Sequence, residues 1–216
     1  MTQTRFQTRL ETHGLSLARG ARPVAANIEL SLLPGSITIL RGANGSGKTT
    51  LLRALAGLLT PSGGSITLTN GETKLEQCSE NCRHHGAFFG HANAIKDRMT
   101  VAENLKFWIK LYQQPITQLD QALRQLRLDE LRDRSTDTLS AGQKRRVGFC
   151  RILMANKPIW LLDEPTASMD ATSIAGLKNA VETHRDKGGC ILIATHDAIT
   201  FENAKELTLS APEVAA

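Results

Sequence analysis

The fold is decided by residues 42–49, which read Gly42-Ala43-Asn44-Gly45-Ser46-Gly47-Lys48-Thr49. This stretch fits the pattern G-x-x-x-x-G-K-[ST] in full. Its glycines allow the backbone to curl so that successive N–H groups point at one anion. A helix that starts directly after the loop adds a partial positive charge at its N-terminus. The sequence therefore predicts a phosphate-binding loop here, and we also assign the next residue, Thr50, to it.

The segments on either side of this loop are of the kind that such a loop requires. Residues 28–33 and 36–41 are apolar and read as short strands, whereas residues 49–59 carry leucines and alanines at helical spacing. Because a strand precedes the loop and a helix follows it, a chance glycine-rich turn is the poorer interpretation. We expect Lys48 to reach the β- and γ-phosphates of a nucleotide and Thr49 to ligate Mg²⁺.

A second motif places two carboxylates at the end of an apolar strand. Residues 158–164 read Pro158-Ile159-Trp160-Leu161-Leu162-Asp163-Glu164. A buried parallel strand explains the apolar run, but it does not explain two acids at its carboxyl end, where ligands of such sheets bind. Asp163 suits the shell of a Mg²⁺ ion, and Glu164 suits a general base that polarises the attacking water. On their own the two acids would also fit the solvated start of a loop.

Composition and charge restrict the class of protein. A chain of 216 residues with 41% hydrophobic and 22% charged residues is globular, and its net charge of +5 suits an anionic partner such as a nucleotide, an acidic protein or a lipid surface. Six Phe, two Trp and one Tyr are few for stacking on bases, which weakens a nucleic-acid interpretation. No apolar run approaches the roughly 18 residues that span a membrane, and residues 1–10 lack the apolar region of a secretory signal.

Hydrophobic periodicity predicts an α/β core that is interrupted by helices. From Thr100 to about Ala155 the pattern is helical, and Thr100-x-x-Glu103 is a capping box that opens a helix through Tyr112. The other predicted elements are strands at 65–69, 86–90, 158–163 and 190–195, a polar loop at 74–85, helices at 117–126 and 171–185, and a helix from Ser140.

Leu139-Ser140-Ala141-Gly142-Gln143 lies upstream of the carboxylate strand. With this motif the sequence resembles the ATP-binding cassette (ABC) transporter family, whose signature is usually written LSGGQ; Ala141 replaces one glycine. The resemblance runs from about residue 10 to residue 207, and its motifs occur in the family's order. Residues 167–170 resemble the D-loop, with Asp170 as its acid, and Thr195-His196-Asp197 resembles the switch-histidine motif.

The resemblance implies a single ABC ATPase domain over residues 1–216, of the P-loop NTPase class. Residues 1–91 and 156–216 would form a RecA-like α/β core with an N-terminal antiparallel β subdomain, and residues 92–155 an inserted helical subdomain. It also implies that two chains sandwich two ATP molecules head to tail. The residues that would contact the nucleotide of the other protomer are Ser140, Ala141, Gly142 and Gln143. Those with catalytic roles would be Glu164, His196 and His91.

Two positions depart from the family's pattern. His91 stands where the family usually has the glutamine of the loop that joins core and helical subdomain, and a histidine is titratable where a glutamine is not. The family also tends to stack an aromatic ring on adenine, but residues 15–24 contain none. Arg19 or Arg22 could stack through a planar guanidinium, or both could be solvated.

Two clusters of side chains leave alternatives open. Lys144, Arg145 and Arg146 follow the signature, and they are either solvated or help to hold anionic nucleotide or acidic neighbours. Cysteines 78 and 82 lie close to His84, His85 and His91, where a metal or haem site is conceivable, although the usual C-x₂-C spacing is missing. Cys150 and Cys190 lie in apolar segments and are expected to be buried thiols.

Within the family, the sequence resembles the ATPases of bacterial cytochrome c maturation. The residues that carry this resemblance are Gly90-His91, Lys96, Arg98 and the signature with the residues after it, up to Val147. This implies an integral membrane subunit as partner and leaves further maturation proteins open. It also implies a peripheral place at the cytoplasmic face of the bacterial inner membrane, with indirect membrane contact. The ATP would serve haem export or release of a haem chaperone. We expect residues 91–105 to form the docking face for the membrane subunit.

Three other functions share some of these motifs. Another small ABC exporter would share all of these motifs. An ABC ATPase acting on nucleic acid or the ribosome typically carries two cassettes or a long coiled coil, and the span from Lys48 to Ser140 contains neither. A small P-loop kinase would not need the signature, the D-loop or a switch histidine. We therefore expect no nucleic-acid partner.

Overall fold

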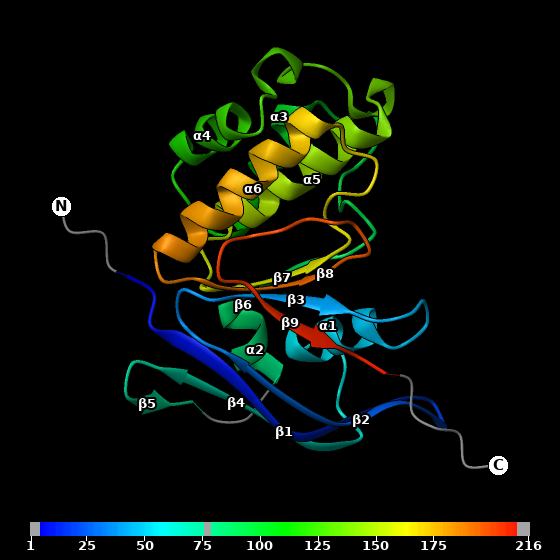
Figure 1. Ribbon diagram of the computed structural model, residues 1–216. Helices are drawn as coiled ribbons and strands as arrows, with labels where there is room; N and C mark the ends of the chain where they lie inside the picture. The colour runs from blue at the N-terminus through cyan, green and yellow to red at the C-terminus, as the bar shows by residue number, and fades with distance from the viewer. Residues whose placement is uncertain (1–4, 76–78, 211–216) are drawn as a thin grey trace. The chain divides into compact units, whose positions relative to one another are not determined.

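The computed structural model describes residues 5–75 and 79–210 (Figure 1). These residues form two compact units. The first comprises the chain up to Phe88 together with residues 157–163 and the chain from His184 onward, and the second comprises residues 89–156 and 164–183.

The first unit contains an antiparallel sheet with strand order β2-β1-β4-β5. Its strands are β1 (Thr8–Arg19), β2 (Arg22–Leu32), β4 (Gly63–Asn70) and β5 (Thr73–Lys74). Side chains of β1 alternate between buried and exposed, and at a register shift the Thr12 hydroxyl donates to the Ile28 carbonyl and accepts from the Leu30 amide. Of these two strands, the sequence pattern predicts only the second half of β2, because polar residues interrupt both strands.

A second sheet in this unit has the order β6-β7-β8-β3-β9. Its strands are β6 (Gly86–Phe89), β7 (Ile159–Asp163), β8 (Cys190–Ala194), β3 (Ile37–Arg41) and β9 (Lys205–Thr208). Strand β8 runs parallel to β7 and β3, and β3 runs parallel to β9. Every residue of β7 and β8 is buried, as expected of central parallel strands. The loops after β3, β7 and β8 therefore start from the same edge of the sheet.

Two helices of the first unit differ from expectation. Helix α1 (Lys48–Leu55) ends earlier than the predicted 49–59. Residues 74–85 were predicted to be a loop, which is wrong for its last part, because Ser79–His85 form helix α2. The only buried residue of α2 is Cys82, which packs against Gly57, and the Arg83 guanidinium donates to the Gly57 carbonyl. Tertiary packing thus stabilises a segment without an apolar helical stripe.

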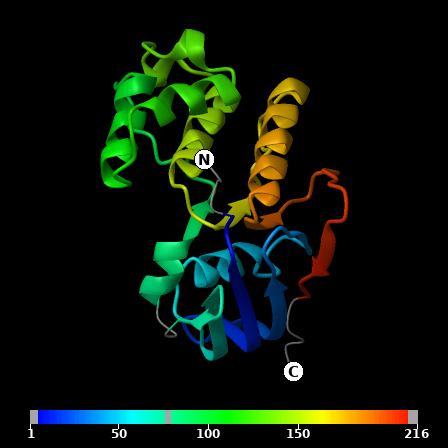
Figure 2. The same cartoon turned by 90° about the vertical axis from the view of Figure 1, so that its left-hand side faces the viewer.

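The second unit is helical (Figure 2). It contains α3 (Val101–Leu111), α4 (Thr117–Gln125), α5 (Ala141–Met154) and most of α6 (Ala171–Asp186), with short 3₁₀ turns at Asp129–Leu131 and Thr136–Thr138. The predicted capping box of Thr100 and Glu103 is confirmed. Helix α5 packs against α3 and α4. Within residues 5–75 and 79–210, no helix has the length and apolar character needed to cross a membrane.

Candidate nucleotide-binding site

The loop between β3 and α1 has a backbone that only glycine can adopt at its ends. Gly47 has φ of 101°, and a Cβ atom there would meet Cγ1 of Val24 at 2.6 Å. Gly42 has φ of 147°, and a Cβ atom there would lie 2.5 Å from the carbonyl oxygen of Leu209. The glycine pattern of the motif therefore follows from left-handed backbone and from close packing against neighbouring segments.

Lys48, the first residue of α1, has its ammonium group at the mouth of this loop. Its Nζ donates to the carbonyls of Gly42 at 2.7 Å and Ala43 at 3.1 Å, and it lies 3.1 Å from Nε2 of His196. The residue is only 8% exposed. The structure thus brings together the predicted phosphate-binding lysine and the predicted switch histidine.

The predicted magnesium ligands also meet. The Thr49 hydroxyl donates a hydrogen bond of 2.8 Å to Oδ2 of Asp163, which is buried at the end of β7. A hydroxyl and a carboxylate are the hard oxygen donors that Mg²⁺ prefers, so this pair fits the ion. In the same loop, the hydroxyls of Ser46 and Thr50 are buried without a hydrogen-bond partner among the described residues. Buried hydroxyls of this kind are suited to a polar ligand.

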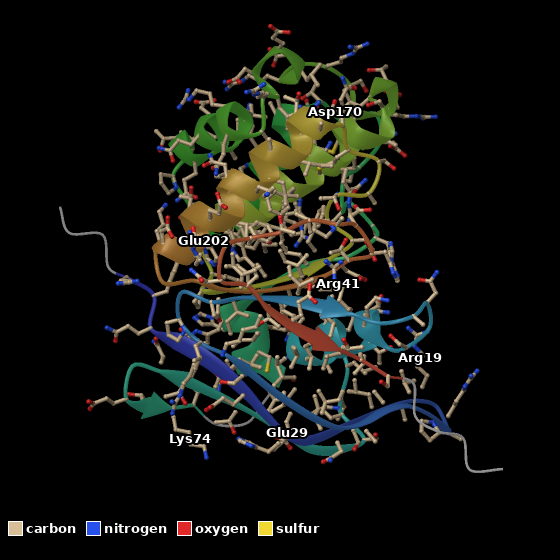
Figure 3. The ribbon with its side chains drawn as sticks, viewed as in Figure 1. Arg19, Glu29, Arg41, Lys74, Asp170 and Glu202 are labelled. Atoms are coloured by element: carbon tan, nitrogen blue, oxygen red, sulfur yellow. The ribbon has the colours of Figure 1, made fainter. Side chains whose placement is uncertain are left out.

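Arg41, the last residue of β3, is a site residue that was not predicted from the sequence. Its Nη1 donates to the carbonyls of Thr195 at 2.9 Å and Asp197 at 2.8 Å, the two residues that flank His196. Its Nε lies 3.7 Å from Oε1 of Glu206 in the neighbouring strand β9. Figure 3 labels Arg41 at this end of the strand. A cation at the end of an otherwise apolar strand, directly before the loop, was the available signal.

The second unit carries the signature at the start of α5. Ser140 is the N-cap of α5: its hydroxyl accepts from the Gln143 amide, and the Gln143 side chain accepts from the Ser140 amide. A Cβ atom on Gly142 would lie 2.4 Å from the carbonyl oxygen of Ser168, whereas Ala141 is exposed. The second signature glycine is therefore fixed by packing within this unit, and the first position accepts alanine.

The other predicted site residues of this unit lie in loops. Glu164 is partly buried and has a left-handed backbone, with φ of 46°, and His91 is exposed. Asp170 is exposed, and its Oδ1 accepts a 2.7 Å hydrogen bond from the Ser173 amide at the start of α6. This hydrogen bond lowers the pKa of Asp170 from its usual value. Asp170 therefore caps α6, whatever else it does.

The three cations after the signature have different environments. Lys144 lies 3.6 Å from Asp97, an acidic neighbour of the expected kind. Arg146 donates to the carbonyls of Leu126 and Arg127. For Arg145 the solvated interpretation is wrong, because the side chain is buried and donates to backbone carbonyls of its own unit.

The remaining candidates are the cysteines, which were considered for a metal site or as buried thiols, and the two arginines that could stack on adenine. Cys78 lies outside the described residues, and the described residues hold no group of three or more metal-binding side chains. Cys150 and Cys190 are buried free thiols as expected, and burial raises the pKa of Cys190 to about 12. Arg19 and Arg22 are exposed, and their backbones are opposite each other where β1 turns into β2. Figure 3 labels Arg19 at this turn.

The phosphate-binding loop follows the parallel strand β3, and its Thr49 donates to Asp163 at the end of β7. This combination defines a P-loop nucleotide-binding protein. Residues 25–167 match the family model described as ABC transporter. The chain is 38% identical to the cytochrome c biogenesis ATP-binding export protein CcmA of Maricaulis maris, over 94% of this chain and 92% of that protein. It is 43% identical to the protein of the same name from Ruegeria pomeroyi, over 84% and 82%.

The fold agrees with these sequence matches. The solved structure of an ATP-binding subunit of an ABC transporter superimposes with a TM-score of 0.80, at 24% identity, over 93% of this chain and 85% of that one. The chain therefore belongs to the ABC transporter family, as one of its ATPase subunits.

Proposed function

We propose that this chain is the ATP-hydrolysing subunit of a CcmAB-type complex in c-type cytochrome biogenesis. The observation that carries this proposal is the identity of 38–43% to proteins named CcmA over most of the chain. The ATP then serves haem export or release of a haem chaperone. The complex lies at the bacterial inner membrane, with this subunit peripheral on its cytoplasmic face and in indirect contact with the lipid.

The binding half of the proposed mechanism uses the first unit. Residues 42–50 wrap the phosphates of ATP, and the Lys48 ammonium leaves the Gly42 and Ala43 carbonyls to neutralise β- and γ-phosphate charge. Thr49 and Asp163 hold Mg²⁺, which supplies charge neutralisation at the phosphates. His196, next to Lys48, contacts the γ-phosphate.

The hydrolytic half uses residues of the second unit. Glu164 follows Asp163 directly in the chain and accepts a proton from the attacking water. His91 takes the place of the family's glutamine and senses the γ-phosphate. Ser140, Ala141, Gly142 and Gln143 contact the ATP held by a second copy of the chain, because the free N–H groups at the start of α5 attract an anion. Asp170 belongs to the D-loop of this nucleotide-sandwich dimer.

The second unit also carries the proposed docking face for a CcmB-like membrane subunit. Lys96 and Arg98 are exposed within residues 91–105. Large apolar side chains are exposed on the same unit: Phe107 by 47%, Leu111 by 58% and Ile116 by 53%. Phe107 and Leu111 lie one turn apart on α3, and Nζ of Lys96 lies 5.2 Å from the centre of the Phe107 ring. Such mixed charged and apolar surface suits a protein partner.

The test is a pull-down of the co-expressed membrane subunit, alongside an ATP-binding assay. Lys96→Glu with Arg98→Glu is expected to reduce recovery of the partner while ATP binding is unchanged. Lys74→Glu with Lys205→Glu makes the same change of charge at exposed strand positions of the first unit and is the control. Recovery of the partner at wild-type level by the first variant would exclude these charges from docking. Recovery of ribosomes or nucleic acid in place of a membrane protein would favour the non-transport alternative.

A further inference from the structure

Arg145 lies inside the second unit and holds the loop that contains His91. The residue is 4% exposed. Its Nη1 donates to the carbonyls of Gly90 at 2.6 Å and His91 at 3.1 Å and to Oδ1 of Asn93 at 3.1 Å. One nitrogen of this side chain thus fixes the backbone on both sides of the bond that joins Gly90 to His91.

The other terminal nitrogen of Arg145 holds Glu164. Nη2 donates to the Glu164 carbonyl at 2.8 Å. Glu164 has φ of 46°, a left-handed conformation that is unfavourable for a residue with a side chain. The charge-assisted hydrogen bond from Arg145 therefore supports a strained backbone at the residue proposed as the general base.

The guanidinium is itself held in place by its surroundings. Its central carbon lies 3.9 Å from the centre of the Phe89 ring, which packs edge-on against Phe149 of α5. Helix α5 approaches the same loop closely, since a Cβ atom on Gly148 would lie 2.7 Å from the Asn93 carbonyl oxygen. Because the guanidinium is planar and fixed by Phe89, its two nitrogens set the positions of both loops together.

We propose that Arg145 is a positioning residue for ATP hydrolysis that couples the His91 loop to the backbone of Glu164. This inference rests on the proposed function of Glu164. The guanidinium that binds residues 90–93 also binds the Glu164 carbonyl. A displacement of residues 90–93 therefore displaces the backbone of Glu164 as well. Arg145 acts through the backbone and does not touch the nucleotide. A lysine at this position presents one nitrogen and cannot span both loops.

Arg145→Lys is the informative variant, and Arg146→Lys is its matched control. Arg146 is the next residue of the same helix and also donates to backbone carbonyls, but those belong to Leu126 and Arg127. We expect Arg145→Lys to lower kcat by roughly 10²-fold, because a misplaced catalytic group costs about that much. Its ATP dissociation constant stays close to that of the wild type, since residues 42–50 are unchanged. Arg146→Lys keeps most of the wild-type kcat.

A double variant separates positioning from general loss of structure. In the background of Glu164→Gln, which lacks the base, Arg145→Lys is expected to lower the single-turnover rate of hydrolysis far less than it does in the wild type. If Arg145→Lys does not yield folded protein by circular dichroism, Arg145→Gln takes its place, since it keeps a planar N–H donor on a shorter, uncharged side chain.

The inference is overturned if the variant keeps a wild-type kcat, or if it loses the same factor with and without Glu164. It is also overturned if the loss lies in ATP affinity instead of kcat. Failure of the proposed function gives a different result: wild-type protein would then not hydrolyse ATP, or Glu164→Gln would keep the wild-type rate.

Discussion

The ammonium of Lys48 lies 3.1 Å from Nε2 of His196, although 148 positions separate the two residues in the chain. They meet because β3 and β8 are parallel neighbours, with Leu40 opposite Ala194, so the loops after both strands begin at one edge of the sheet. A lysine ammonium can only donate, so a hydrogen bond between these two atoms has Nε2 of His196 as its acceptor. Arg41 fixes this arrangement by holding the carbonyls on either side of His196.

Replacement of the loop lysine removes the charge that meets the phosphates. We expect Lys48→Ala to abolish ATP turnover and to weaken nucleotide binding strongly. The measurements are steady-state hydrolysis and equilibrium binding of a fluorescent ATP analogue. Normal hydrolysis by this variant would exclude residues 42–50 as the phosphate-binding loop.

The two small residues of the signature are expected to respond differently to exchange. Gly142→Ala places a Cβ atom 2.4 Å from the Ser168 carbonyl oxygen, which forces the start of α5 away from residues 167–170. We expect it to lower the free energy of unfolding by about 1–3 kcal/mol and to reduce ATPase activity.

Ala141→Gly is the matched control for Gly142→Ala. Ala141 is exposed, and its replacement restores the usual form of the signature. We expect activity near the wild type and a small loss of stability. Chemical denaturation and ATPase assays of both variants check this, and equal effects of the two exchanges would contradict the packing argument.

His184 is a buried histidine of the first unit. Its ring is stacked on Trp160, with ring centres 3.9 Å apart, and lies 5.4 Å from the ring of Phe6. Burial lowers the pKa of His184 from 6.5 to about 4, against an opposing contribution from its hydrogen bond with the Pro158 carbonyl. The folded protein therefore contains the neutral ring at neutral pH.

Stability should consequently fall on acidification. Between pH 6.5 and 4 the unfolded chain binds a proton at His184 and the folded chain does not. The free energy of unfolding therefore falls as the pH drops through this window. At pH 4 the loss relative to neutral pH is about 3 kcal/mol.

His184→Phe keeps a stacked ring but cannot titrate, and the Pro158 carbonyl still accepts from the Cys190 amide. We expect this variant to have a flatter dependence of unfolding free energy on pH between 6.5 and 4. Urea denaturation at several pH values measures this, and a slope equal to that of the wild type would exclude His184 as its source.

The parts of this protein that were predicted from sequence are those in which a local pattern dictates local chemistry. The glycine loop, the two acids at the end of the β7 segment and the capping box of α3 each depend on residues close together in the chain. Their contacts across the fold, such as Thr49 with Asp163, followed from the rule that parallel strands end at one edge.

Other features depend on packing that no local pattern reveals. Strand β1 was missed because polar residues interrupt its apolar pattern, and α2 because Cys82 is its only buried residue. Arg145 resembled two neighbouring surface cations in sequence. Only the approach of the His91 loop and Glu164 to α5 distinguishes it from Lys144 and Arg146.

In the proposed mechanism two copies of the chain enclose ATP, and Glu164 is the base that hydrolyses it. Glu164→Gln keeps a hydrogen-bonding side chain but removes the base. The most direct measurement is light scattering coupled to gel filtration of this variant, with and without ATP and Mg²⁺, beside its rate of hydrolysis. We expect a monomer without ATP, a stable dimer with ATP and very slow turnover. A variant that stays monomeric with ATP and hydrolyses it at the wild-type rate would exclude both the ATP-sandwich dimer and Glu164 as the base.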